Sequence, residues 1–235
     1  MMKNKLFIVL SLTFVLCGCV QNNEEDKPIH CSFYNENYSV EDVIQYFDEV
    51  VLASEYSDGE GDTSLVQKWE GPIYYVMEGH SEQDRLVLEK LFSELNKVEG
   101  FPGIYKAEGL VSAKIHFYNE KDFYKEMGHI VSMNADGAVQ YWYDTDMNYI
   151  YEGKVAYRNN MDDDVRESVL KEEIINMLGI TDTTLREDSI TYQYSSTNKD
   201  LSEMDWIILK ILYHDEIKAS MDDTKCHEII KKLYY

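Results

Sequence analysis

Basic residues are scarce in this sequence. Lysine and arginine together number 22, against 44 aspartates and glutamates, and the formal net charge is −22 at pH 7. This balance argues against a nucleic-acid partner, whose phosphates require Lys and Arg, and against electrostatic adhesion to anionic lipid. Proline is also scarce, with three residues, whereas 44% of the chain is hydrophobic and 13% aromatic. A chain of 235 residues with this composition is expected to fold around its own core.

The hydrophobic run Leu6–Leu16 is too short to span a bilayer, which takes about 20 residues. It follows Lys3 and Lys5 and has the proportions of a secretory signal. The run ends in Leu-Cys-Gly-Cys, which resembles the lipobox of bacterial lipoproteins, where the last cysteine, here Cys19, becomes acylated. An ordinary cleaved signal with incidental cysteines is the alternative.

The lipobox predicts a signal peptide over residues 1–18 and a lipid anchor on Cys19. Cleavage there removes two lysines and changes the formal charge from −22 to −22 − 2 = −24. We therefore expect an exported lipoprotein at the bacterial cell envelope, whose contact with the membrane is the lipid itself. The acidic stretch NNEED that follows Cys19 is consistent with exposure on the cell surface.

Two cysteines, Cys31 and Cys226, remain after Cys19 is acylated. An even pair in an exported chain suggests a disulfide between the two ends of the domain. A loop of that length would contribute roughly 4–5 kcal/mol in the chain-entropy model. Two unpaired thiols are the alternative.

The chain after the anchor divides into a tether and one domain. Residues 19–38 are rich in Asn and acids without helical periodicity, which is typical of a flexible tether. From residue 39 to 235 the pattern predicts helix, strand, helix, three strands and then helices. The expected helices cover 39–56, 81–100, 165–178, 201–213 and a short segment from 223; the expected strands cover 68–79, 110–120, 138–144 and 148–160. This order predicts a mixed α/β fold with helices packed on a sheet and a helical C-terminal part.

Several catalytic signatures are absent. No two of the six histidines lie four residues apart, and no G-x-S-x-G or glycine-rich phosphate loop is present. His227 begins a segment HEII, but Lys231 occupies the second ligand position, so we interpret this near-motif as chance. His116 alternates with Ile115 and Phe117 in an expected strand and is interpreted as a sheet-face residue.

The segment LKEEIINMLGITD, Leu170–Asp182, carries polar residues at the spacing of a metal-binding motif. Glu172 and Asn176 are four apart and share one face of the expected helix, and Gly179 stands where a left-handed helix cap is usual. Asp182 follows three residues later. The order E-E-x-x-N-x-x-G-x-x-D has the spacing of the zinc-protease signature H-E-x-x-H-x-x-G-x-x-H/D. In that signature two histidines bind zinc, the glutamate activates water, and the glycine turns the chain toward a third ligand.

The sequence after this segment strengthens the likeness. The C-terminal helix of matrixin-type metzincins begins with Leu-Ser-x-x-Asp and ends with Leu-Tyr. This chain resembles it, with Leu201-Ser202-Glu203-Met204-Asp205 and, at the same distance as in metzincins, Leu212-Tyr213. The chain is still more similar to a bacterial secreted family, domain of unknown function 2927, whose helix reads Arg/Lys-Glu-Glu-x-x-Gln/Asn-x-Leu-Gly-Leu/Ile. Residues 171–180 fit that form. The resemblance covers most of residues 39–214 and implies a metzincin-like (zincin) fold.

The ligand positions depart from the metzincin pattern. Glu172 and Asn176 stand where the zinc histidines would be, and an amide oxygen is a poor ligand for zinc. Ile190 or Thr191 falls near the place of the expected methionine turn. We therefore expect no cofactor, with a divalent metal as the alternative. That metal would be zinc at an atypical site, or a harder ion such as calcium bound by the oxygens of Glu172, Asn176 and Asp182.

Glu173 is the catalytic candidate if the protein is an enzyme, because it aligns with the water-activating glutamate. The alternative is a structural carboxylate that pairs with a backbone group or with a cation such as Arg158 or Lys171. Glu172 and Glu173 are adjacent, do not face each other on a helix, and so are not a carboxylate dyad.

Three functions compete on this basis. The first is a non-catalytic protein that binds a protein or peptide partner in the former protease cleft, by strand addition at the sheet edge. The second is a metal-dependent peptidase or hydrolase with an atypical site at Glu172, Glu173 and Asp182. The third is a structural lipoprotein without a ligand. The 19 tyrosines favour a recognition surface if residues 141–143 are exposed, although aromatic residues also simply favour strands.

The lipid anchor is tested by Cys19→Ala. This variant should leave the membrane fraction because it lacks the acylated residue, as measured by fractionation and immunoblotting. Cys17→Ala keeps the small residue that a lipobox requires and should stay with the membrane. Unchanged fractionation of Cys19→Ala would reject the anchor.

Overall fold

The computed structural model describes residues 33, 35–52, 65–131, 134–195 and 197–234. Its helices are α1 (Val40–Phe47), which continues as the π-helix η1 (Asp48–Leu52), α2 (Glu82–Leu95), α3 (Glu120–Met127), α4 (Asp163–Met177), α5 (Glu203–Leu212) and α6 (Asp223–Tyr234). Its strands are β1 (Lys68–Trp69), β2 (Ile73–Glu78), β3 (Ile104–Lys106), β4 (Ala113–Tyr118), β5 (Gly137–Tyr143) and β6 (Tyr149–Arg158). The predicted mixed α/β class is therefore confirmed.

The strands form one sheet in which all pairs except one are parallel. The path runs β1-β6-β4-β2-β3, and β5 pairs with β6 in an antiparallel hairpin with a register shift between Trp142 and Tyr143. Short β1 runs parallel to the start of β6, through the pairs Lys68–Tyr149 and Trp69–Ile150. Within the described residues β5 pairs only with β6, so it is an edge strand.

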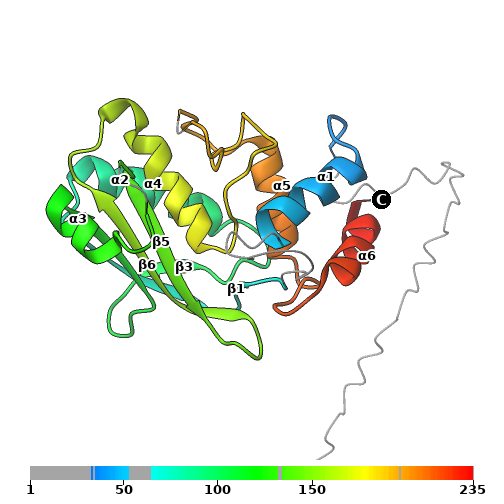
Figure 1. Ribbon diagram of the computed structural model, residues 1–235. Helices are drawn as coiled ribbons and strands as arrows, with labels where there is room; N and C mark the ends of the chain where they lie inside the picture. Colours follow the sequence, from blue (N-terminus) through cyan, green and yellow to red (C-terminus); the bar gives the residue numbers. More distant parts are fainter. Residues whose placement is uncertain (1–32, 34, 53–64, 132–133, 196, 235) are drawn as a thin grey trace, which may run out of the picture.

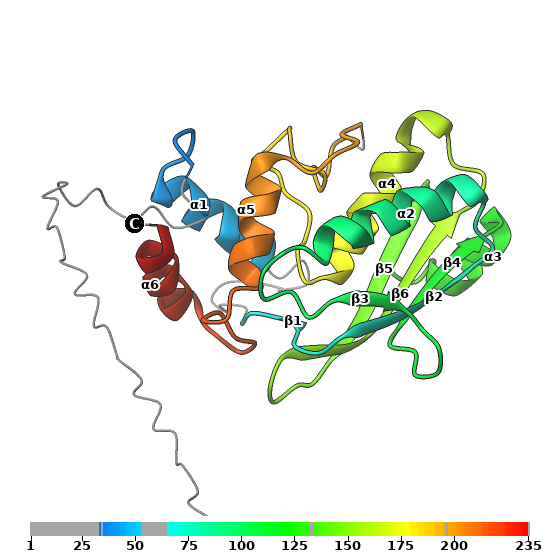
Figure 2. The same cartoon turned by 180° about the vertical axis from the view of Figure 1, so that it is seen from behind.

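Helices α2 and α4 lie together on one face of the sheet, and α1, α5 and α6 gather beside it (Figures 1 and 2). Because strand side chains alternate between faces, Gly137 and Gly153 point to the face covered by α4, where Glu173 and Met177 meet them. The opposite face carries α3, whose Phe123 packs in a small cluster with Ala138 and Ala156. The main core thus lies between the sheet and the helices.

Buried Lys68 joins the sheet to the helical part. Its Nζ donates to the backbone oxygens of Leu212, 2.9 Å away at the C-terminal end of α5, and Ile217, 2.6 Å away. Loss of hydration lowers the pKa of Lys68 to about 8. The carbonyl oxygens at the end of a helix lack partners within the helix, and the lysine supplies a donor to that of Leu212 and another to Ile217 in the segment after α5.

Most expected elements are found, with three differences. The expected strand over 68–79 is two strands, β1 and β2, interrupted at residues 70–72. The expected run of three strands between the second and third helices was incomplete, because α3 and short β3 had not been predicted. The expected helix over 39–56 continues as a π-helix and is described only to Leu52.

The expected lipid anchor and disulfide involve residues that the structure does not describe. The signal peptide, the lipid anchor, most of the tether and Cys31 lie outside the described residues, so the anchor and the Cys31–Cys226 disulfide stay predictions. Cys226 itself is fully buried on α6. Among the helices that the structure describes, none is long and apolar enough to cross a membrane.

Candidate functional site on helix α4

Helix α4 holds the polar residues that the sequence singled out. The chain leaves the helix through Gly179, whose φ of +94° is left-handed. A Cβ atom there would lie 2.2 Å from the backbone oxygen of Gln67, so no residue with a side chain fits. The last carbonyls of the helix accept hydrogen bonds from Trp69 Nε1 to Met177 and from the Tyr213 hydroxyl to Leu178, both 2.9 Å long. The Leu-Tyr end of α5 therefore caps α4.

Asn176 and Asp182 come together after this turn. Asn176 Nδ2 donates to Asp182 Oδ1 over 3.0 Å. Burial raises the pKa of Asp182, and the hydrogen bond from Asn176 opposes part of the rise. Asn176 Oδ1 is buried and accepts no hydrogen bond from any described residue. Two of the three positions that align with metal ligands thus bind each other.

The π-helix η1 fixes the loop that carries Asp182. Thr181 donates its backbone N–H to the oxygen of Val50 over 2.7 Å. Glu49 accepts from the hydroxyl of Thr183 at 2.6 Å and from the backbone N–H of Thr184 at 2.7 Å. π-Helical turns are rare and are frequent at functional sites. Here the turn presents a carbonyl and a carboxylate to the loop, which holds Asp182 against the end of α4.

Glu173 lies at the start of edge strand β5. A Cβ atom on Gly137 would come within 2.6 Å of Glu173 Cγ and Oε1, so the glutamate side chain lies directly over that glycine. Burial raises the pKa of Tyr157 well above its usual range, and the negative charges of Glu173 and Glu172 add to the rise. Both glutamates therefore lie near the hydroxyl that donates to the oxygen of Leu170.

The cations suggested as partners for Glu173 form other ion pairs. Arg158 pairs with Asp136 at 2.5 Å. Lys171 is buried and pairs with Glu167 at 2.9 Å and Asp200 at 3.0 Å. The Arg158 pair lies next to the start of β5, and the Lys171–Asp200 pair ties α4 to the segment that precedes α5.

The turn at residues 189–191 is tied to the start of α5 by buried Asp205. Asp205 Oδ1 accepts from Ser189 Oγ at 2.8 Å, and Oδ2 accepts the backbone N–H of Ile190 at 3.0 Å. The same carboxylate completes the capping box with Ser202. The motif that resembled metzincins at 201–205 therefore has a structural role: it anchors the turn where a methionine turn was expected.

The donor set on α4 does not fit zinc. Within the described chain no group of three or more His, Cys, Asp or Glu side chains could hold a metal ion. The side chains at the ligand positions are two carboxylates and an amide whose nitrogen faces Asp182. The two histidines weighed in the sequence lie elsewhere: His116 on β4 is 3.5 Å from Glu78, and His227 on α6 is 2.7 Å from Asp48.

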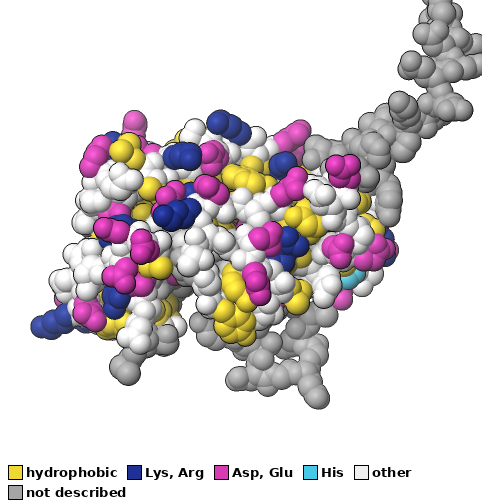
Figure 3. Space-filling view, turned by 90° about the horizontal axis from the view of Figure 1, so that it is seen from above, with side chains coloured by type: hydrophobic (Ala, Val, Ile, Leu, Met, Phe, Trp, Pro, Cys, Tyr) yellow, Lys and Arg dark blue, Asp and Glu magenta, His cyan; other side chains and the backbone are white. Residues whose placement is uncertain are grey.

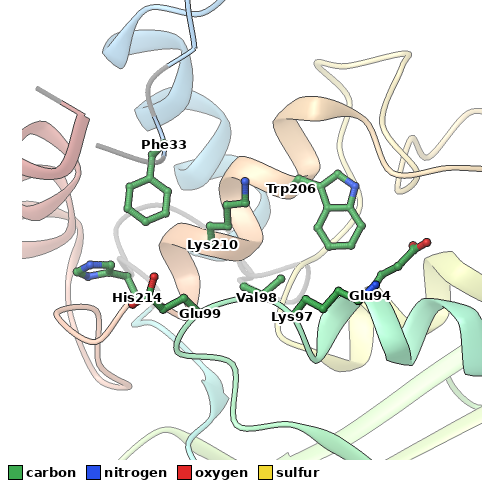
Figure 4. Close-up of a pocket in the computed structure, with 8 residues that line it drawn as sticks. All are labelled: Phe33, Glu94, Lys97, Val98, Glu99, Trp206, Lys210 and His214. Carbon is green, nitrogen blue, oxygen red and sulfur yellow. The ribbon is translucent and has the colours of Figure 1, made fainter. Parts of the chain in front are cut away.

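A pocket of about 370 Å³ is lined by residues outside α4 (Figure 4). It lies between the end of α2, the residues that follow it, α5 and Phe33. Its lining residues are Phe33, Glu94, Lys97, Val98, Glu99, Trp206, Lys210 and His214. None of these was a sequence candidate, because no motif links positions so far apart in the chain.

The aromatic residues at the end of β5 are partly exposed. Trp142 is 36% and Tyr143 37% exposed, whereas Tyr141 is half-buried and donates its hydroxyl to Gln67 Oε1 at 3.1 Å. The condition set for a recognition surface at residues 141–143 is thus met at two of the three positions.

These features define the class of protein: a mixed α/β domain whose polar helix face adjoins an edge strand. The model of the family described as protein of unknown function (DUF2927) matches residues 40–232, and the chain belongs to this family. The family predicted from residues 171–180 is therefore confirmed. No curated protein matches the chain.

Replacement of Asp182 tests the Asn176–Asp182 contact. Asp182→Asn keeps an oxygen acceptor for Asn176 and removes a partly buried charge, so its unfolding free energy at neutral pH should equal or exceed that of the wild type. Asp182→Ala removes the acceptor and should be less stable by about 1–2 kcal/mol. Denaturant unfolding measures both.

The pH dependence has a defined sign. Because the folded pKa of Asp182 is raised, the folded state binds this proton more tightly than the unfolded state. The wild type should therefore gain stability relative to Asp182→Asn as pH falls toward the acidic range. An Asp182→Asn variant that is markedly unstable at neutral pH would show that the carboxylate is needed as an anion.

Proposed function

We propose that this protein is a non-catalytic peptide-binding lipoprotein of the bacterial cell envelope, with a metzincin-like domain that has lost zinc chemistry. The observation that carries the proposal is the hydrogen bond from Asn176 to Asp182. It joins two positions that would have to point at a common metal ion in an active relative.

The strand order supports the metzincin-like part. Strands β3, β2, β4 and β6 are parallel, β5 is the antiparallel edge, and the helix with the candidate residues follows β6 directly. The proposed metzincin-like fold requires the helix that carries the candidate residues to lie beside an edge strand, and α4 lies beside β5 in this way. The glycine exit at Gly179 and the Tyr213 contact to α4 agree with the same ancestry.

The edge strand supports the binding part. Arg158 donates its backbone N–H to the oxygen of Asp136 over 2.8 Å. In an antiparallel pair this bond places Asp136 and Arg158 opposite each other as a hydrogen-bonded pair, and such pairs alternate along the ladder. Backbone groups of residues 137, 139 and 141 therefore point away from β6. An extended peptide could add a strand there by main-chain hydrogen bonds.

The polar face of α4 lies next to this edge because Glu173 covers Gly137. A peptide on β5 would pass Glu173, which in this proposal contacts the ligand rather than activating water. A general base for hydrolysis needs a polarised water beside it, and the donors at 172, 176 and 182 do not fit zinc, the ion that would supply it. Lipid on Cys19 would hold the domain at the membrane through the tether.

Metal analysis tests the loss of zinc chemistry. The wild type should contain no stoichiometric zinc and should not cleave casein. The double variant Glu172→His/Asn176→His rebuilds the two-histidine pattern with Asp182 as third ligand and should bind about one zinc per chain. Glu172→His/Asn176→Ala lacks one histidine and serves as the control. Zinc in the wild type that is lost on Glu172→Ala would replace this proposal by the hydrolase, and a folded double variant without zinc would reject the metzincin-like geometry.

Binding at the edge strand is tested with Val139→Pro. This change removes an N–H that points away from β6 and so leaves the hairpin ladder intact, as edge strands tolerate. A fluorescent peptide of alternating Gln and Thr should bind Val139→Pro at least about tenfold more weakly than the wild type. Val139→Ala removes most of the same side chain, keeps the N–H, and should bind within about threefold of wild type. Equal affinity for all three proteins would exclude strand addition on β5.

A further inference from the structure

Exposed hydrophobic side chains concentrate in the β5–β6 hairpin. Among the described residues eleven large hydrophobic side chains are exposed, and five of them lie within ten consecutive positions. These five are Trp142, Tyr143, Met147, Tyr149 and Tyr151. Single exposed hydrophobics are ordinary, whereas five in one hairpin make that hairpin a candidate for interaction. We call residues 142–151 the aromatic hairpin.

The aromatic hairpin is held in one shape. Asp144 Oδ1 accepts the backbone N–H groups of Asp146 at 3.0 Å and Met147 at 2.8 Å, which closes the turn. Asn148 takes a left-handed φ of +55° and donates its side-chain amide to Ser220 Oγ over 2.9 Å. The pairs with β1 fix the start of β6. A partner would therefore meet an ordered surface. Because the hairpin is already ordered, binding would cost little of its conformational entropy.

The aromatic rings flank the end of β5 on both faces of the sheet. Tyr143 pairs with Ile150, whose side chain lies close to Gly179 at the end of α4, so Tyr143 belongs to the helical face. Trp142 pairs with Glu152 and belongs to the opposite face. A strand that pairs with β5 alternates its own side chains between the same two faces. Its residues at this end would reach Tyr143 on one side and Trp142 on the other.

The charge of the aromatic hairpin has one sign. It contains Asp144 and Asp146 and no basic residue, and Glu152 follows directly. Two lysines point to the same face of the sheet as Glu152. Lys114 Nζ lies 4.0 Å from Glu152 Oε1, a distance typical of a weak surface pair, and Lys154 pairs with Glu126 at 3.1 Å. Acidic side chains are also spread over the face seen from above rather than gathered in one patch (Figure 3). Aromatic rings flanked by carboxylates favour cations, through ring faces and charge together.

We propose that the aromatic hairpin selects a lysine- or arginine-rich extended segment of a partner protein, whose cationic side chains lie over Trp142 and the tyrosines while its backbone runs along β5. The inference rests on the proposed function, since it names the kind of peptide that the edge strand takes. Charge complementarity favours a basic segment over the other candidate partners. A second copy of this chain would bring like charge to the surface, and so would an anionic membrane.

Three peptides test the selection: the alternating Gln and Thr peptide, and matched peptides with Lys or with Glu in place of Gln. With the full-length protein the Lys peptide should bind at least about tenfold more tightly than the Glu peptide, and added salt should weaken it. Trp142→Ala/Tyr151→Ala should remove most of that preference, and Asp146→Asn/Glu152→Gln should reduce it. Tyr194→Ala, at an exposed tyrosine outside the hairpin, should not alter it.

The outcomes separate the two proposals. If all three peptides bind equally and Val139→Pro weakens each of them, strand addition stands and the basic selectivity is wrong. A Lys preference that the hairpin variants remove but Val139→Pro leaves intact supports the aromatic hairpin and excludes the edge strand. A neutral oligosaccharide that binds at Trp142, with no preference for Lys over Glu, would overturn the basic-segment assignment, and so would the absence of any peptide binding.

Discussion

Helix α4 can lie against the β5–β6 hairpin because two glycines leave room for it. A Cβ on Gly137 would meet Glu173, and a Cβ on Gly153 would come within 2.9 Å of Met177 Cγ and Sδ. The close approach sets the height of the whole helix above the sheet. Everything that the candidate site contains, from Glu173 at the strand edge to the exit through Gly179, depends on that height. The hairpin and the helix therefore pack as one unit, although a loop of several residues separates them in the chain.

The polar end of α4 is held by hydrogen bonds within the protein. Loss of hydration around a carboxylate is costly unless a donor meets it, and Asn176 supplies that donor to partly buried Asp182. The amide of Asn176 acts here as a hydrogen-bond donor to the carboxylate of Asp182. The π-helix and Glu49 hold the loop on its other side. The geometry is preserved by contacts within the protein.

The sequence predicts local features of this fold well and non-local ones poorly. The helices that begin at Ser39, Ser81 and Ser202 have capping boxes and apolar stripes within a few residues, so they are readable from the chain. Helix α3 and strand β3 are short, and packing rather than propensity decides them. The spacing at 172–182 predicts which residues gather at the end of α4. It does not predict that Asn176 donates to Asp182, or that Glu173 lies over Gly137, because strand order fixes those contacts.

Buried Lys68 has a consequence for cooperativity. The lysine belongs to β1, yet it donates to Leu212 and Ile217, so separation of the sheet from the C-terminal helices would break both hydrogen bonds and expose the packed junction to water. Trp69 next to it and Tyr213 of the same helical part both hold the end of α4. Subglobal opening at this junction should therefore be rare, and the slowest-exchanging amides of the sheet and of α5 should exchange together, as one cooperative unit.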